Sequence, residues 1–534
     1  MGRAAHVALA LAAAPLFAAF VWQSSIATVG DDSVSYLAMA RWFAGSADAF
    51  LAPWLAWHSH FPPLFPMVLA ATGGANDLVV AHLAVAFFAI VSVVLLARVA
   101  ALRLGSDWGG FWVAAAFLTL PTAWISVKGI LAESLYLALS LGVILAHQKL
   151  LARGVPRARA YLLFGVLLAL AYSTRSAGVA LVAAFVVHEA IRAASTRRLR
   201  PAAWLALVPV AAFAVAWVVA RPGGHAYGAT IASLATAWRD YPVKALELAA
   251  ETFPGGWIAS FVAEGDVSPA VRITLYALGL VALAGSVRAA LRNRLDGWYV
   301  LLMAGLVFIW VFGAENMRRL LYPIVPLALL HAAEMVVCGV RRLGLARPRF
   351  AIALACAMAP VLWAPAILLV AGKARDHTPL IEGSRYSAAE ITDYYRVINL
   401  AHARALAAKH AATLGGLEAL RTATPPDARV MWMRPEYVAL LGGREAVPSY
   451  YDWDARTLAS RIREARVDYL VVAAMSKLDL AHRTGDPATA LGHAAPYSRA
   501  VLRIHSPHTG QDEFILLAIE RAALDAYLAA APPS

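Results

Sequence analysis

The sequence predicts a polytopic α-helical membrane protein of about eleven transmembrane helices with a small C-terminal α/β domain on the outer side. Its composition is 61% hydrophobic and only 15% charged, with a mean hydropathy of +0.64, whereas a soluble globular chain is about 25% charged. The apolar residues come in segments of about 20, the length of a helix that crosses a bilayer. After residue 372 these segments end and charged residues become frequent.

The apolar segments, taken in order, give the predicted spans. The first, at 8–26, follows Arg3 and is Ala-rich, which is also the pattern of a cleaved signal peptide. Its length and the acidic pair behind it favour a retained helix. Further spans are expected at about 78–97, 109–127, 130–148, 160–174, 177–194, 202–220, 270–288, 297–314, 320–338 and 350–371.

The loops between the spans alternate in charge. Every second loop is short and basic, as the positive-inside rule requires of the cytoplasmic side. The opposite loops hold most of the carboxylates of the membrane half, including Asp31, Asp32, Glu133 and Glu315. We therefore expect a multi-pass protein of the bacterial inner membrane with a cytoplasmic N-terminus and a periplasmic C-terminal domain. This topology, rather than nucleic-acid binding, explains the net charge of +13.

The first outer loop, 30–77, opens with Asp31 and Asp32. The residues after them, Tyr36 among them, predict a short amphipathic helix. A carboxylate pair is costly to desolvate at a membrane boundary, which suggests a functional role. The alternative is a helix N-cap with a first-turn charge that complements the helix dipole.

The same loop carries His58 and His60 just before Pro62 and Pro63. An H-x-H pair completed by Asp31 or Asp32 is a pattern that can bind a divalent metal. Histidines near lipid headgroups are the more common case. We found no P-loop, dinucleotide-binding or nucleophile-elbow motif.

The predicted C-terminal domain covers 373–534, after a transmembrane domain at 1–372. Residues 378–420 have helical character, and Pro425 and Pro426 break the pattern. ARVMWM, VDYLVVAAM, AVLRIHS and FILLAIE then read as strands, with a helix-like YVALLGG between the first two. Strands alternating with helices indicate a small α/β domain.

Ionisable residues gather at the outer ends of several spans. Glu133 follows Lys128 by five residues, Arg175 lies between two closely spaced spans, and Arg318 and Arg319 precede another span. Arginine and lysine can neutralise a phosphate, and a nearby carboxylate can act as a general base. Snorkelling to headgroups explains any single arginine, and an ion pair with Lys128 or a first-turn charge explains Glu133. The clustering on one face favours chemistry on an anionic, lipid-borne substrate.

With these motifs the chain resembles the GT-C superfamily of membrane glycosyltransferases, in particular the branch of protein O-mannosyltransferases and of the transferase that adds aminoarabinose to lipid A. Five features occur in the family's order. They are Asp31-Asp32 with Tyr36, the Pro-Pro motif HFPPLFPMVLA, Glu133 in AESLYLAL, Thr174-Arg175 with Gly178, and RRLLYPIVP from Arg318 to Pro326, which contains Tyr322. Two details depart from the family pattern. The acidic pair is Asp-Asp where relatives often have Asp-Glu, and two arginines precede the tyrosine.

The resemblance implies inverting transfer of a sugar from a polyprenyl-phosphate donor to a lipid, glycan or protein acceptor on the outer face. Asp31 or Asp32 would be the catalytic base, and Glu133 would orient the acceptor or the sugar. Lys128, Arg175, Arg318 or Arg319, and Tyr322 would bind the donor phosphate, while Tyr36, His58 and His60 would contact the sugar or acceptor. No cofactor is required, although a divalent metal remains an option at the histidine pair.

Two other functions fit a membrane protein of this kind. A transporter or flippase of a lipid-linked intermediate would need polar residues or broken helices near the bilayer midplane, whereas the charges here collect at the outer ends. A non-catalytic envelope assembly protein would tolerate the change of Asp31 and Asp32 to asparagine.

Overall fold

The computed structural model describes most of the chain, with gaps. The described residues are 32–46, 50–51, 61–152, 158–220, 235–236, 238–262, 267–309, 314–342, 368–382, 386–395, 397, 399–449, 453–473 and 487–530, with single positions between 9 and 21. The chain divides into two compact units. The first comprises Met1–Ser24 with Ser59–Ala371, and the second comprises Ser25–His58 with Gly372–Ser534.

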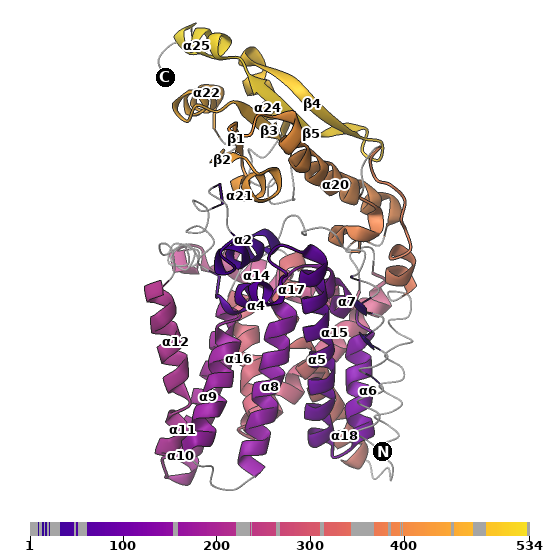
Figure 1. The fold of residues 1–534 in the computed structure, drawn as a ribbon. Coiled ribbons are helices and arrows are strands. Elements are labelled where there is room, and N and C mark those ends of the chain that lie inside the picture. Colours follow the sequence, from indigo (N-terminus) through magenta and orange to yellow (C-terminus); the bar gives the residue numbers. More distant parts are fainter. Residues whose placement is uncertain are drawn as a thin grey trace. The chain divides into compact units, whose positions relative to one another are not determined.

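The described part of the first unit is helical, and its long helices run alongside one another (Figure 1). The helices are α4 (Leu64–Thr72), α5 (Leu78–Leu104), α6 (Asp107–Leu118), α7 (Pro121–Lys128), α8 (Glu133–Ala152), α9 (Ala158–Tyr172), η1 (Ser176–Gly178), α10 (Val179–Thr196), α11 (Pro201–Trp204), α12 (Leu207–Ala220), α14 (Pro242–Ala259), α15 (Pro269–Leu291), α16 (Leu295–Ile309), α17 (Ala314–Leu321) and α18 (Val325–Arg342).

Local sequence sets several of these helix ends. The Asp77 side chain caps α5 by accepting hydrogen bonds from the amides of Val79 and Val80. Gly105, with φ at 63°, ends α5 in the left-handed conformation that glycine adopts readily. The Ser106 side chain then caps α6, and Pro121 opens α7 at the first helical position, where its missing N–H costs nothing.

Most predicted spans correspond to helices of the first unit, but their number is not confirmed. Four helical stretches in the described ranges are long and apolar enough to cross a membrane, namely Leu78–Leu104, Ser176–Thr196, Pro201–Ala220 and Pro269–Leu291. The predicted span at 109–127 is the pair α6 and α7, bent by 60°. The predicted spans at 8–26 and 350–371 lie largely outside the described residues.

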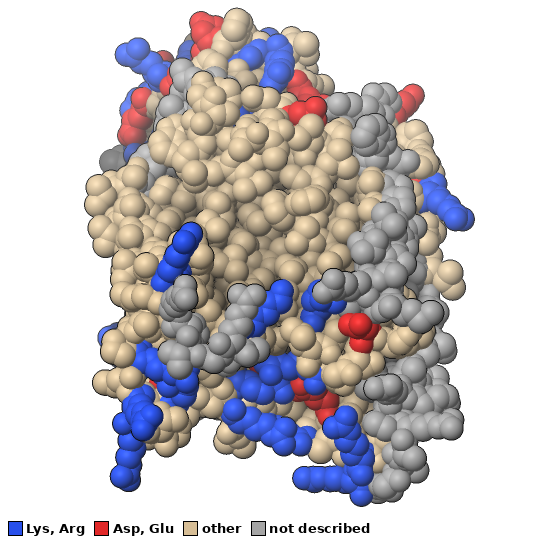
Figure 2. Space-filling view, turned by 60° about the horizontal axis from the view of Figure 1, so that its bottom comes forward, with Lys and Arg blue, Asp and Glu red and all other residues tan. Residues whose placement is uncertain are grey.

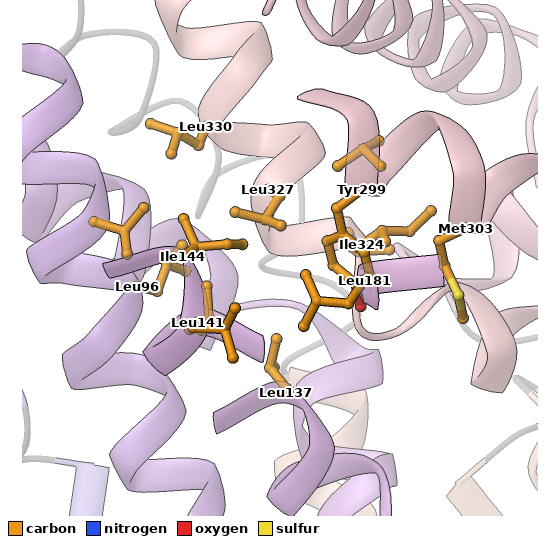
Figure 3. Close-up of a cluster of buried hydrophobic side chains, with 14 of the residues drawn as sticks. Leu96, Leu137, Leu141, Ile144, Leu181, Tyr299, Met303, Ile324, Leu327 and Leu330 are labelled. Carbon is orange, nitrogen blue, oxygen red and sulfur yellow. The ribbon is translucent and has the colours of Figure 1, made fainter. Parts of the chain in front are cut away.

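One continuous apolar core joins these helices. Figure 3 shows its centre, where Leu137, Leu141 and Ile144 of α8 point toward Leu181 of α10 and Leu327 of α18. These side chains are almost fully buried. Because α8 contributes side chains to this core along its whole length, the core fixes the position of Glu133, the first residue of α8.

The second unit contains a five-stranded sheet in the order β2-β1-β3-β5-β4. Its strands are β1 (Arg429–Trp432), β2 (Glu445–Pro448), β3 (Tyr469–Val472), β4 (Ser498–Ser506) and β5 (Gln511–Ile519). β1 pairs parallel with β2 and β3, whereas β5 pairs antiparallel with β3 and β4. The four predicted strands are confirmed. β2 was not predicted, because its residues EAVP include Glu and Pro, which are depleted in strands.

Helices cover both faces of this sheet. Leu458 and Ile462 of α22 (Ala455–Glu464) and Leu524 of α25 (Arg521–Ala530) form one core with Ile515 and Leu517 of β5. The alternate residue Phe514 points to the other face, where its ring meets Gly416 of α20 (Leu400–Ala423).

The prediction of helical character from residue 378 was wrong for its first part. α20 begins only at Leu400, where the Asn399 side chain accepts a hydrogen bond from the His402 amide. The preceding segment contains the short turns η2 (Ala388–Glu390) and η3 (Thr392–Tyr395). There Asp376 accepts hydrogen bonds from Tyr394 and Arg404.

Candidate functional site

Glu133, the first residue of α8, is the centre of the charged cluster in the first unit. Its side chain is fully buried, and its Oε1 atom pairs with the guanidinium groups of Arg175 and Arg319, whose side chains are 11% and 20% exposed. Its Oε2 atom has no hydrogen-bond partner among the described residues. A buried carboxylate is tolerated only where charges and hydrogen bonds offset its desolvation. Two arginines distant in the sequence therefore converge on Glu133, as the predicted clustering requires.

A tight turn between α9 and α10 holds Arg175. The Gly178 amide donates to the Arg175 carbonyl at 2.8 Å, which closes the turn of η1. A Cβ atom at Gly178 would lie 2.7 Å from Tyr172 Cα, so only glycine fits this close approach. The Leu64 amide, directly after the Pro-Pro motif, donates to the Ser173 carbonyl at 2.9 Å. Two motifs far apart in the sequence thus position one arginine.

The helix α17 holds Arg319, and α14 packs against it. A Cβ atom at Gly256 of α14 would lie 2.3 Å from Met317 Cβ, so this glycine lets the two helices touch. The sequence left open which arginine belongs to the cluster. In the structure Arg319 Nε donates to Glu133, while Arg318 is buried beside it in the chain.

Further polar and aromatic residues surround the cluster. Lys128, the last residue of α7, is buried, and α7 contacts α17. Tyr322 is buried with its ring centroid 5.9 Å from that of Phe117. One turn after Glu133, the Tyr136 and Tyr299 hydroxyls lie 3.1 Å apart. This tyrosine pair was not predicted from the sequence, because a single tyrosine within an apolar segment is common and does not indicate a partner.

The residues predicted in the first outer loop are described only in part. Asp32 is the N-cap residue of α2 (Ser33–Phe43), but its side chain makes no capping hydrogen bond. The helix α2 itself confirms the predicted short helix, and Tyr36 is one of its buried residues. Asp31, His58 and His60 lie outside the described residues. The convergence of Asp31, Asp32 and Tyr36 with Glu133 stays a prediction, as does a metal at the histidine pair.

A second buried carboxylate, Asp296 near the start of α16, was missed. It pairs with Arg103 at 2.5 Å, with Arg294 at 2.6 Å and with His331 Nε2 at 3.0 Å. Ser286 hydrogen-bonds the other ring nitrogen of His331 at 2.8 Å. Asp296 could have been noticed as the one acid within a basic loop, since an isolated carboxylate there implies arginine partners.

One group of side chains in the described ranges has the composition of a metal site. The ligand atoms of His147, His188 and Glu189 lie within 4.8 Å of one another, and all three residues are buried. Arg192 already donates two hydrogen bonds to Glu189. A divalent cation would have to sit beside that guanidinium, which opposes its binding electrostatically.

The arrangement around Glu133 suits recognition of a phosphate. An arginine has five N–H donors in a planar fork that matches phosphate oxygens. Glu133 pairs with Arg175 and Arg319 and holds both guanidinium groups in place. Both arginines are partly exposed, whereas the carboxylate is not. The carboxylate therefore orients the two arginines, which are the groups that a ligand can reach.

The described residues form a long helical unit and a small α/β unit, the fold that the motifs predicted. No family model matches the sequence, and no curated protein matches it. ArnT from Cupriavidus metallidurans, solved with undecaprenyl phosphate, is similar in structure, with a TM-score of 0.50 and 13% identity over 99% of both chains. The apo state of the same protein gives the same values.

An oligosaccharyltransferase from Archaeoglobus fulgidus, tethered to an acceptor peptide with an NVT sequon, reaches a TM-score of 0.49 at 13% identity. That match covers 95% of this chain and 74% of the other. The likeness to ArnT, at 13% identity, shows the fold alone.

Proposed function

We propose that this protein is a membrane glycosyltransferase that moves a sugar from a polyprenyl-phosphate donor to an acceptor on the outer face of the bacterial inner membrane. The observation that carries the proposal is the buried Glu133 carboxylate with Arg175 and Arg319 paired to it. The fold supports it, because ArnT, which shares this fold, was solved with undecaprenyl phosphate bound.

Arg175 and Arg319 would bind the phosphate of the donor. During transfer the bond between the anomeric carbon and the phosphate oxygen breaks, and the leaving polyprenyl phosphate gains negative charge. Guanidinium groups held in place before the reaction stabilise that charge without reorganising. Lys128, Arg318 and Tyr322 belong to the same region and complete the proposed donor site.

Asp31 or Asp32 would act as the general base. One of these carboxylates takes the proton of the acceptor hydroxyl or amine as that group attacks the anomeric carbon. The new glycosidic bond forms on the face opposite the leaving phosphate, so the configuration inverts. Tyr36, His58 and His60 would contact the acceptor or the sugar. The acceptor is a lipid, a glycan or a protein, and the reaction needs no cofactor.

The test compares the variants Asp31→Asn and Asp32→Asn with Asp107→Asn. Asp107 is a suitable control because it is a partly exposed carboxylate in the first turn of α6. Membranes that contain each variant would be given a panel of radiolabelled undecaprenyl-phosphate sugars. We expect a loss of transfer of about 100-fold or more in one of the first two variants, as for the removal of a general base, and none in the control.

Mass spectrometry of envelope glycolipids and glycoproteins with and without the protein would identify the acceptor. The proposal fails if the double variant Asp31→Asn/Asp32→Asn still transfers sugar at the wild-type rate. It also fails if loss of the protein changes no envelope glycan.

A further inference from the structure

A cavity of about 620 Å³ lies among the residues at the ends of α5, α15 and α18 and the start of α16. This is the end of the helical unit that carries the basic loops. Six arginines line the cavity, and they are Arg103, Arg288, Arg292, Arg294, Arg341 and Arg342. Figure 2 shows Lys and Arg side chains concentrated toward this end, with few Asp and Glu among them.

Two of the six arginines have carboxylate partners. Arg103 pairs with Asp296, and Arg294 pairs with both Asp296 and Glu334. The other four, Arg288, Arg292, Arg341 and Arg342, form no ion pair with any residue that the structure describes. Six arginines and two carboxylates leave a formal charge of +4 around one cavity.

Helix geometry explains each of these arginines singly but not their arrangement. Arg288 lies in the last turn of α15, and Arg341 and Arg342 lie in the last turn of α18, where a cation complements the helix dipole. The positive-inside rule also favours arginine at this end. Neither effect requires the side chains to surround the same concave space, where they repel one another.

Beside Glu334, the partner of Arg294, much of the remaining wall is apolar. Leu102, Leu104, Met335 and Val337 line the same cavity, and Leu102 is 57% exposed. A ligand that fits must therefore combine negative charge with apolar surface. Basic pockets between transmembrane helices on the cytoplasmic side suit anionic lipid headgroups in this way.

From this charge and this wall we infer that the cavity binds the phosphate groups of an anionic phospholipid from the surrounding bilayer. The arginines without carboxylate partners bind the phosphodiester oxygens through their forked N–H donors. The glycerol and the first acyl carbons lie against the leucines. A headgroup with two phosphates fits best, since it offsets more of the four positive charges than a single phosphate does.

The experiment measures lipid binding to the purified full-length protein by native mass spectrometry and by thermal stabilisation in detergent. The probes are diphosphatidylglycerol, phosphatidylethanolamine and inorganic phosphate. The test variant is Arg292→Gln/Arg341→Gln. The matched control, Arg197→Gln/Arg198→Gln, removes the same charge from two exposed arginines that do not line the cavity.

We expect wild-type protein to prefer diphosphatidylglycerol over phosphatidylethanolamine. The test variant should bind diphosphatidylglycerol roughly 30-fold more weakly, about fivefold for each charge lost, and the control should stay close to wild type. If the test variant does not fold, Arg292→Lys/Arg341→Lys keeps the charge, loses the forked donors, and should bind with intermediate affinity.

Three results would overturn the inference. One is an equal loss in the control, which would show general attraction to the basic face. Another is the absence of any preference for the anionic lipid in wild-type protein. The third is binding of inorganic phosphate without binding of lipid, which would identify a soluble phosphate compound as the ligand.

Discussion

Replacing Glu133 by glutamine separates a structural ion pair from a site that binds a ligand. The substitution keeps the shape of the side chain and one acceptor oxygen but removes the charge that faces Arg175 and Arg319. Breaking a buried ion pair costs about 3 to 5 kcal/mol. Because both arginine side chains are partly exposed, water reaches them, and we expect the lower end, about 3 kcal/mol.

The expected effect on transfer is separate from the effect on stability. Once the carboxylate no longer fixes them, the two guanidinium groups adopt other rotamers. A displacement of about 1 Å in a positioning group can cost about 100-fold in rate. We therefore expect transfer per folded molecule to fall about 100-fold in Glu133→Gln, with a higher KM for the donor.

Asp296→Asn is the matched control within the same chain. Asp296 is also fully buried and also pairs with two arginines, but it lies beside the basic cavity and has no role in the proposed reaction. Both variants should unfold more readily in detergent, by similar amounts. Only Glu133→Gln should lose transfer per folded molecule. The reasoning is refuted if Glu133→Gln unfolds like wild type, or if it is destabilised yet transfers sugar within threefold of the wild-type rate.

Three further outcomes are expected. Gly178→Ala should destabilise the protein by about 1 to 3 kcal/mol and slow sugar transfer, because the new Cβ meets the backbone of α9. The control is Gly142→Ala, whose Cβ would make only an ordinary 3.8 Å contact. In the same unfolding and transfer assays this control should behave like wild type. Arg319→Lys should raise the KM for the donor about tenfold, since lysine lacks the fork that binds phosphate bidentately, and an unchanged KM would remove Arg319 from the donor site. Burial alone would raise the pKa of Asp376, but hydrogen bonds, that from Tyr394 foremost, lower it to about 2. This carboxylate therefore contributes stability that is present above its unfolded pKa of about 3.9 and is lost as the pH falls to 2. The melting temperature of Asp376→Asn should lie below that of wild type at neutral pH, and the gap should close between pH 4 and pH 2.

The sequence predicted those features that repeat along the chain or that rest on a few local residues. Apolar segment length located most helices of the first unit, and short strand-like runs located four of the five strands. The order of the motifs predicted that Glu133, Arg175 and the Arg318-Arg319 pair lie in one cluster. The choice of Arg319 over its neighbour could not be predicted, because it depends on how α17 rotates when Met317 packs on Gly256.

Other features depend on contacts that no local pattern encodes. The irregular segment before Leu400 looked helical because its composition is helical, yet its backbone is held by tertiary bonds such as that from Tyr394 to Asp376. The Asp296 network includes Arg103, which lies on α5 and is 193 residues away along the chain, and Arg294, which directly precedes α16. Counting the charges in each loop gives the net charge of the loop but does not show which residues form ion pairs.

The buried carboxylates Glu133 and Asp296 suggest how one helical unit serves two ligand sites. Glu133 opens α8, and α8 is 20 residues long, which places its two ends about 30 Å apart. Asp296 lies with the basic residues of the opposite loops. Each carboxylate holds two arginines in place but offsets only one of their two charges. Beyond Asp296 four further arginines form no ion pair in the described ranges, whereas at Glu133 the paired arginines are themselves the partly exposed groups. Removal of Glu133 should therefore impair the proposed donor site directly. Removal of Asp296 should leave the donor site intact and instead strengthen anion binding in the basic cavity, because Arg103 and Arg294 lose a carboxylate partner.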